Sequence, residues 1–286
     1  VGFNTITALG DSDTRFSSPI HRPAVFQGSV ESVSGSSITI QGLPGWTVNQ
    51  FVYAAGTQTN TYYVSIGSGN KVGMYYTVTA NSADSGIANT GSITIDTAGD
   101  VIDGGSGIIQ GDTLSVIPYW TLSTLFPGQL GITGTSSAGG AGAATKIYFP
   151  NLTSAGKNLA PPFYYFYYTG TGGTGPSWRK NGAGAAVMND EVIAPDVPVI
   201  IRQDGVATST ITVTGTVPTS ERAYVLATIT ANTDQDNAIA IDVPVPFTLT
   251  ESNLAQSGAF AGTTSAGGAT GGDRLFVYDN SIVGKN

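Results

Sequence analysis

Glycine and proline interrupt this sequence every few residues, and this spacing limits how long its secondary-structure elements can be. The 286 residues include 39 Gly and 14 Pro. Because both residues destabilise the interior of a helix, few helices longer than about three turns can form. The one weak helical candidate, residues 122–130, is itself interrupted by Pro127. The chain must therefore fold largely from short elements of another kind.

Several segments between these residues alternate as β-strands do. Residues 29–33 and 37–40 flank a glycine turn and have the pattern of a hairpin. Residues 75–79 and 92–95 repeat this design, and residues 208–214 alternate again. Val, Ile, Thr and Tyr pack well on a pleated surface. These patterns predict an all-β protein.

The composition excludes several classes of protein. Only 10% of residues are charged and the formal net charge is −8, so the chain is poorly suited to bind nucleic acid or an anionic membrane. No stretch approaches the roughly 18 uninterrupted apolar residues of a membrane-spanning helix. The absence of cysteine excludes a disulfide scaffold, a thiolate metal site and a cysteine nucleophile.

An internal duplication divides the chain. The sequence GTSSAGGA of residues 134–141 recurs 128 residues later as GTTSAGGA, and the sequence GKN of residues 156–158 recurs at the same offset. The sequence TITA of residues 5–8 recurs at residues 228–231, an offset of 223. Identical runs at a constant offset are specific evidence for duplication.

The two offsets differ by 95 residues, which places an insertion of about that length in the first copy. Its hairpin patterns predict a separate small β-barrel over residues 24–119, the alternative being an elaborated loop. Residues 1–23 and 120–220 are then a first β-sandwich-like module. Residues 221–286 are a second, incomplete module.

The second copy lacks counterparts of the strands that follow Asn158 in the first copy. Such a sandwich exposes a sheet edge and an apolar groove, so either the chain is truncated or another chain fills the groove. The predicted edge of the incomplete module comprises Leu275, Phe276, Val277 and Tyr278. The candidate donor strand is the N-terminal segment, with Val1, Phe3, Thr5, Ile6, Thr7 and Leu9. Its likeness to residues 228–231 counts partly against this choice, since it is also a natural first strand of its own module.

Six consecutive aromatic residues form the most unusual local run. On a strand they point alternately to both faces. One interpretation is a platform on which sugars stack; the other, which we favour, is a strand packed in the core or at an interface. The run comprises Phe163, Tyr164, Tyr165, Phe166, Tyr167 and Tyr168.

Two pairs of alternating aspartates occupy equivalent places in the two copies, Asp11 with Asp13 and Asp234 with Asp236. Carboxylates in loops are plausible Ca²⁺ ligands, although the ordinary interpretation is an Asx-turn, and we expect no other cofactor. His21 is the only histidine, and no nucleophile motif accompanies it, so it is interpreted as a polar loop residue.

Four sequence elements occur in order: VGFNTIT at the start, the aromatic run within FPNLTSAGKNLAPPFYYFYY, then SWRKNGAGAA and VIIR. In these elements the chain resembles a family of uncharacterised secreted proteins known from verrucomicrobial genomes. The resemblance implies a secreted protein with a repeated layout, and it supplies no catalytic residues. This sequence departs from the family by ending before a second aromatic run.

These observations favour a structural role over an enzymatic one. The start at Val1 is interpreted as removal of a signal peptide, which implies an extracellular, cell-surface protein. We expect a subunit of a filament or surface assembly, a homopolymer formed head-to-tail by β-strand complementation. The alternative is a secreted carbohydrate-binding or adhesive module that contacts glycans through the aromatic run and Trp46, Trp120 or Trp178.

Overall fold

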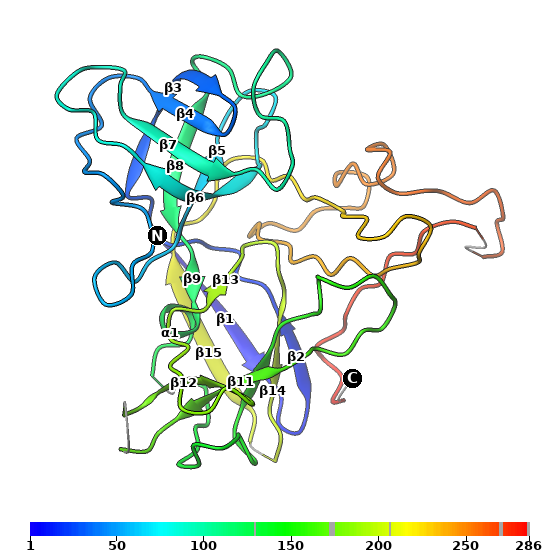
Figure 1. Cartoon of the computed structure of the whole chain (residues 1–286). Coiled ribbons are helices and arrows are strands. Elements are labelled where there is room, and N and C mark those ends of the chain that lie inside the picture. The colour runs from blue at the N-terminus through cyan, green and yellow to red at the C-terminus, as the bar shows by residue number, and fades with distance from the viewer. Residues whose placement is uncertain (129, 172–174, 206, 269–270, 285–286) are drawn as a thin grey trace.

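The computed structural model describes the whole chain except residues 129, 172–174, 206, 269–270 and 285–286 (Figure 1). Among the described residues, fifteen strands and one four-residue helix, α1 (Leu122–Leu125), are present. The chain is therefore all-β, as the spacing of glycine and the alternation of strand residues predict. Two bodies account for the strands: a closed barrel and a sandwich-like module (Figure 1).

The barrel lies within the predicted insertion and confirms that it is not a loop. Its six antiparallel strands pair in the order β3-β4-β7-β6-β5-β8 and close on themselves, which leaves no free edge. The aromatic rings of Trp46 and Phe51 lie 5.2 Å apart, edge to face, within its buried core. The strands are β3 (Phe26–Ser34), β4 (Ser37–Ile40), β5 (Tyr62–Ile66), β6 (Tyr75–Asn81), β7 (Ser92–Asp96) and β8 (Thr113–Pro118).

The sandwich-like module is assembled from chain on both sides of the barrel. A five-stranded antiparallel sheet has the order β12-β11-β10-β14-β2, and two further antiparallel pairs are β1 with β15 and β9 with β13. These strands are β1 (Gly2–Ala8), β2 (Asp13–Phe16), β9 (Trp120–Thr121), β10 (Lys146–Tyr148), β11 (Tyr164–Tyr168), β12 (Ser177–Lys180), β13 (Val192–Ile193), β14 (Val199–Arg202) and β15 (Ser209–Gly215).

One hydrophobic core joins the β1–β15 pair to the five-stranded sheet. Alternation places Ile211 and Val213 of β15 on the inner face, while the three threonines that alternate with them are exposed. The sheet contributes Ile147, Trp178 and Ile201, each fully buried in the same cluster. This arrangement gives the first module a sandwich of two layers, with α1 at one side (Figure 1).

The second copy of the repeat has a different structure from the first. The described residues after Gly215 contain no strand, although they include the positions equivalent to three strands of the first module. Between residues 222 and 242 the chain is hydrogen-bonded to the barrel at Arg222 and Ala223 and to the first module at Asp236 and Ala240, whereas the described residues of 244–277 are mostly exposed. Figure 1 shows this exposed part as an arm that extends away from both bodies.

Candidate functional site

The candidate donor strand is seated in its own module. β1 pairs with β15 along its whole length, from Gly2 opposite Gly215 to Ala8 opposite Ser209. Ala8 is buried, whereas Phe3 keeps 76% of its surface exposed and Val1 is fully exposed. Thr5, Ile6, Thr7 and Leu9 continue this alternation of exposed and covered side chains. Within the described residues β1 has one strand neighbour, so its other edge faces outward.

The sheet order shows which strands pair at the repeated positions. The repeat covers β1, where TITA recurs unchanged, β2, where Asp13 matches Asp236, and β10, where KIY faces the similar RLF of residues 274–276. In the first module these strands pair with β15, β14, and both β11 and β14, respectively. All of these partners come from residues 164–215. Among the described residues, the segments of the second copy at the positions of β1, β2 and β10 form no strand and have no such neighbours.

The predicted edge of the second copy is exposed apolar chain. Phe276 and Val277 are 79% and 86% exposed, and Leu275 is 47% exposed. Ile147, the residue of β10 equivalent to Leu275, is fully buried. Tyr278 is the exception in this group, since it is half-buried and its hydroxyl donates to the Asp13 carbonyl at 3.3 Å.

Residues 278–284, which we call the tail segment, lie along the outer edge of β2. The Arg15 N–H donates to Asn280 Oδ1 at 2.9 Å, and Asn280 Nδ2 donates to the Arg15 carbonyl at 2.7 Å. The Asp13 N–H donates to the Gly284 carbonyl at 2.7 Å, and the Arg15 guanidinium lies 4.8 Å from the Tyr278 ring centre. Sequence analysis missed this contact, because no local pattern indicates where an irregular segment docks.

The first copy makes the equivalent contact with the second. The Asp236 N–H donates to the Gly156 carbonyl at 3.0 Å, and the Asn158 N–H donates to Asp236 Oδ2 at 2.7 Å. Asp236 is the counterpart of Asp13, and Gly156 is the counterpart of Gly284. In each repeat copy, the turn at the aspartate pair is therefore hydrogen-bonded to the GKN segment of the other copy, through Gly156 or Gly284. The repeated GKN motif and the repeated aspartate pairs mark both partners in the sequence, but neither pattern indicates that the two meet.

The four aspartates of the Ca²⁺ hypothesis have protein partners. Asp13 binds Arg202, Asp234 binds Lys157 at 2.7 Å, and Asp11 Oδ1 accepts from the Gly205 N–H at 3.1 Å. The hydrogen bond from Lys157 lowers the pKa of Asp234 below its ordinary value. Within the described ranges, no group of three or more metal-ligating side chains is found. The two pairs are thus separate sites, each built around an ion pair.

The aromatic run is packed on both faces. Tyr165 belongs to the main core of the first module, and Phe166 and Tyr168 belong to a second buried cluster on the opposite face of the sheet. Arg179 of β12 lies 4.1 Å above the Tyr168 ring centre. Phe163, Tyr164 and Tyr167 are half-buried, so none of the six side chains is fully exposed to solvent. The run serves packing, as the favoured interpretation predicts.

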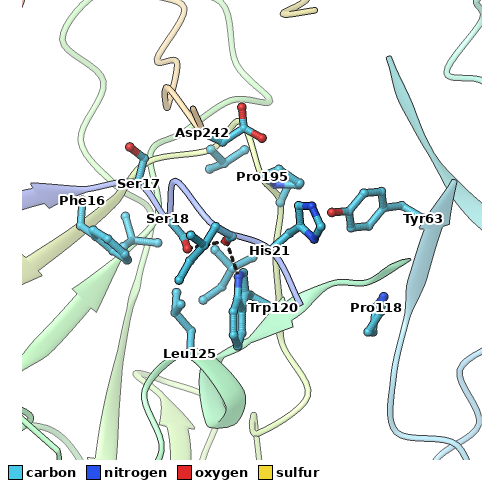
Figure 2. A pocket seen from close by; sticks show the side chains of 15 residues that line it. Phe16, Ser17, Ser18, His21, Tyr63, Pro118, Trp120, Leu125, Pro195 and Asp242 are labelled. Atoms are coloured by element: carbon cyan, nitrogen blue, oxygen red, sulfur yellow. Dashed lines mark hydrogen bonds between the residues drawn. The ribbon is translucent and has the colours of Figure 1, made fainter. Parts of the chain in front are cut away.

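A polar cluster lies where the barrel meets the first module. Figure 2 shows His21 beside Tyr63, with Asp242 at the other end of the pocket. The cavity has a volume of about 20 Å³, enough for roughly one water molecule. Arg222 Nε lies 3.1 Å from Asp242 Oδ2. The pKa of His21 is lowered from its ordinary value, mainly because the imidazole is buried.

The ion pair between Arg222 and Asp242 anchors the start of the second copy. Both side chains are buried, at 5% and 6% exposure, and Arg222 Nη1 donates to Ser65 of β5 at 3.3 Å. The Tyr224 hydroxyl donates to Asp242 Oδ1 at 2.6 Å. Arg222 and Ala223 are therefore bound to the barrel, Asp242 is held beside them by the ion pair, and the arm begins after it.

Comparison with family models, with curated proteins and with solved structures finds no match to this chain. None of the helices among the described residues has the length and apolar character needed to cross a membrane.

Proposed function

We propose that the chain is a structural subunit of an extracellular filament or surface assembly, in which copies join head-to-tail by β-strand complementation. One observation carries this proposal. At the positions equivalent to β1, β2 and β10, the described residues of the second copy pair with no strand, and Phe276 and the adjacent Val277 are 79% and 86% exposed. An unpaired strand has free backbone N–H and C=O groups, which a strand from another molecule can satisfy.

The exposed side chains of the second copy support the same proposal. Phe276 and Val277 leave most of their surface in water, and so do Val245 and Leu249 earlier in the arm. Burial of apolar surface contributes about 25 cal/mol per Å². A contact that covers these side chains is therefore favourable, and a contact that does not close into a ring extends into a filament.

Low charge and the resemblance to secreted proteins favour an extracellular assembly of this kind. Durable joints made by strand addition depend on backbone hydrogen bonds and on alternating side chains in pockets, neither of which needs charge. Since the chain has no cysteine, its durability rests on packing, strand pairing and assembly.

Electron microscopy of the purified chain, without denaturant, tests the proposal. We expect filaments from the unmodified protein and a loss of filaments when Val277, which is 86% exposed, is replaced by aspartate. The matched control is Ile87→Asp on a barrel loop, where the side chain is 62% exposed. Discrete, monodisperse particles under all conditions would contradict the proposal.

The glycan-binding alternative has less support. The aromatic run offers no exposed platform, and Trp46 and Trp178 are buried at 4% and 0% exposure. Sugar stacking requires an accessible ring face. Binding of the purified monomer to a glycan array, lost on substitution of the half-buried Trp120 or Tyr164, would favour this alternative.

A further inference from the structure

We propose that the tail segment, residues 278–284, is the element that subunits exchange. In the assembly it lies along β2 of a neighbouring subunit rather than along β2 of its own chain. This inference rests on the proposed function, and it replaces the N-terminal strand by the tail segment as the part that crosses between subunits.

The receiving surface is a sheet edge. β2 is the last strand of the five-stranded sheet, so within the described part of the chain the backbone groups on its outer side pair with no strand. The side-chain amide of Asn280 both accepts from and donates to the backbone of Arg15, as a neighbouring strand would. The Gly284 N–H donates to Ser12 Oγ at 2.9 Å, beside the bond from Asp13 to the Gly284 carbonyl. This edge is thus built to receive an extended segment.

The duplication shows that this joint is a contact between copies. The bond from Asp13 to Gly284 and the bond from Asp236 to Gly156 are the same contact with the two copies interchanged. Such reciprocity is the pattern of an isologous interface between two equal units. A neighbouring subunit presents the same turn at Asp13 and the same segment that ends at Gly284. The tail segment can therefore make the same contact with a neighbouring subunit as with its own chain.

The arm allows the exchange without unfolding either body. The described residues of 244–277 are exposed except for Leu254, Phe260 and Gly272, which are half-buried. Their hydrogen bonds, such as those from Ser252 to Thr248 and from Asp273 to Ala261, join residues within the arm itself. A fully extended segment of this length reaches roughly 110 Å. The tail segment can therefore reach a neighbouring subunit while residues 222–242 stay anchored.

The contact between the tail segment and β2 is the same whether the segment lies on its own β2 or on the β2 of another subunit. This contact by itself therefore does not favour either form. Contacts that exist only in the exchanged form must shift the balance, and the exposed Phe276 and Val277 next to the tail segment are placed to provide them. When a subunit gives its tail segment to one neighbour and receives that of a different neighbour, the contact between subunits does not close and produces a head-to-tail polymer.

A covalent tether tests which segment crosses between subunits. Because the chain has no cysteine, introduced pairs are the only thiols. The variant Arg15→Cys with Ser281→Cys, closed by a short thiol-specific cross-linker, holds the tail segment on its own β2. The matched control is Thr5→Cys with Thr212→Cys, which are opposite each other in register and hold β1 on its own β15. We expect the first tether to reduce filament formation at least tenfold and the control tether to leave it unchanged.

A mixing experiment gives an independent measurement. Chains with only Arg15→Cys and chains with only Ser281→Cys are mixed, cross-linked and digested. A peptide that joins positions 15 and 281 can come only from two different chains, and we expect it in filaments. A tethered tail that still polymerises, or mixed filaments without this peptide, overturns the exchange and leaves the proposed function standing. Failure of the unmodified chain to polymerise overturns both.

Discussion

Arg202 holds both carboxylate oxygens of Asp13, with Nε 2.6 Å from Oδ1 and Nη2 2.7 Å from Oδ2. This pair joins β14 to β2 across the receiving edge of the sheet. Asp13 is 2% exposed, and its hydrogen bond to Arg202 raises the pKa of that guanidinium. The pair keeps β2 in place, and β2 in turn receives the tail segment.

Removing the cation from this pair should destabilise the first module. In Arg202→Met the Asp13 carboxylate stays buried without its partner, and we expect a loss of about 3 kcal/mol in the free energy of unfolding. Urea denaturation measures this loss. The double variant Arg202→Met with Asp13→Asn is the control and should recover part of the stability; an equal loss in both variants would show that the buried charge is not the cause.

Equivalent residues of the two copies should respond differently to the same change. Ile147→Ala removes a fully buried side chain and should cost about 2–5 kcal/mol. Leu275→Ala, at the equivalent place in the second copy, should change the stability of the monomer by less than about 0.5 kcal/mol, because Leu275 is 47% exposed. Thermal and urea unfolding of the monomeric chains compare the two. A large loss for Leu275→Ala would mean that the second copy is packed in the monomer.

Stability should fall as the pH falls through the range just below 6.5. Burial lowers the pKa of His21 from that value, so the unfolded chain takes up this proton before the folded chain does. Urea midpoints of the native chain and of His21→Gln at about pH 7.5 and about pH 5 isolate the effect. Asp196, whose pKa is raised by burial, acts in the opposite direction but is common to both chains. Equal pH dependence in the two chains would contradict this role of His21.

The barrel should fold by itself. Residues 24–119 contain all six barrel strands and the whole of the barrel core. A closed barrel has no free edge that depends on the rest of the chain. We expect the isolated segment to unfold cooperatively in urea, with dispersed amide signals by NMR. A segment without a cooperative transition would show that the contacts at Tyr63 and Arg222 are required.

Calcium should have little effect on stability. Both oxygens of Asp13 are bound by Arg202, and Asp234 is bound by Lys157, so a Ca²⁺ ion would have to displace these cations. We expect the melting temperature to change by less than about 1 °C between excess Ca²⁺ and a chelator. A larger rise in Ca²⁺ that Asp234→Asn abolishes would restore the metal hypothesis.

The local elements of the fold were predictable from short-range patterns. The hairpin of β3 and β4, the strands β6 and β7, and the inserted barrel follow from alternation, glycine turns and the two repeat offsets. The packing of the aromatic run was also anticipated, because six adjacent rings on one strand must cover both faces. Most of these features depend on residues that are near each other in sequence, and the inserted barrel depends also on the two repeat offsets, which are read directly from the sequence.

The candidate site was predictable only in part. The second copy was visible as a repeat of the first, but the strands that pair at the repeated positions of the first module became clear only from the sheet order. The N-terminal strand was the expected donor, yet β1 is paired inside its own module. The tail segment went unnoticed because its main contact uses backbone groups of β2 and one asparagine side chain, which carry no recognisable pattern.

By itself the sequence determined the all-β class, the duplication and the inserted barrel, since alternation, turn chemistry and repeat offsets are local or linear properties. Only the tertiary structure decided that Asp13 meets Gly284 and that Asp236 meets Gly156. Those contacts join segments far apart in the chain, and their hydrogen bonds are made largely by backbone groups that every residue carries. Which backbone groups meet is set by how the sheets pack, and this leaves no trace in residue type.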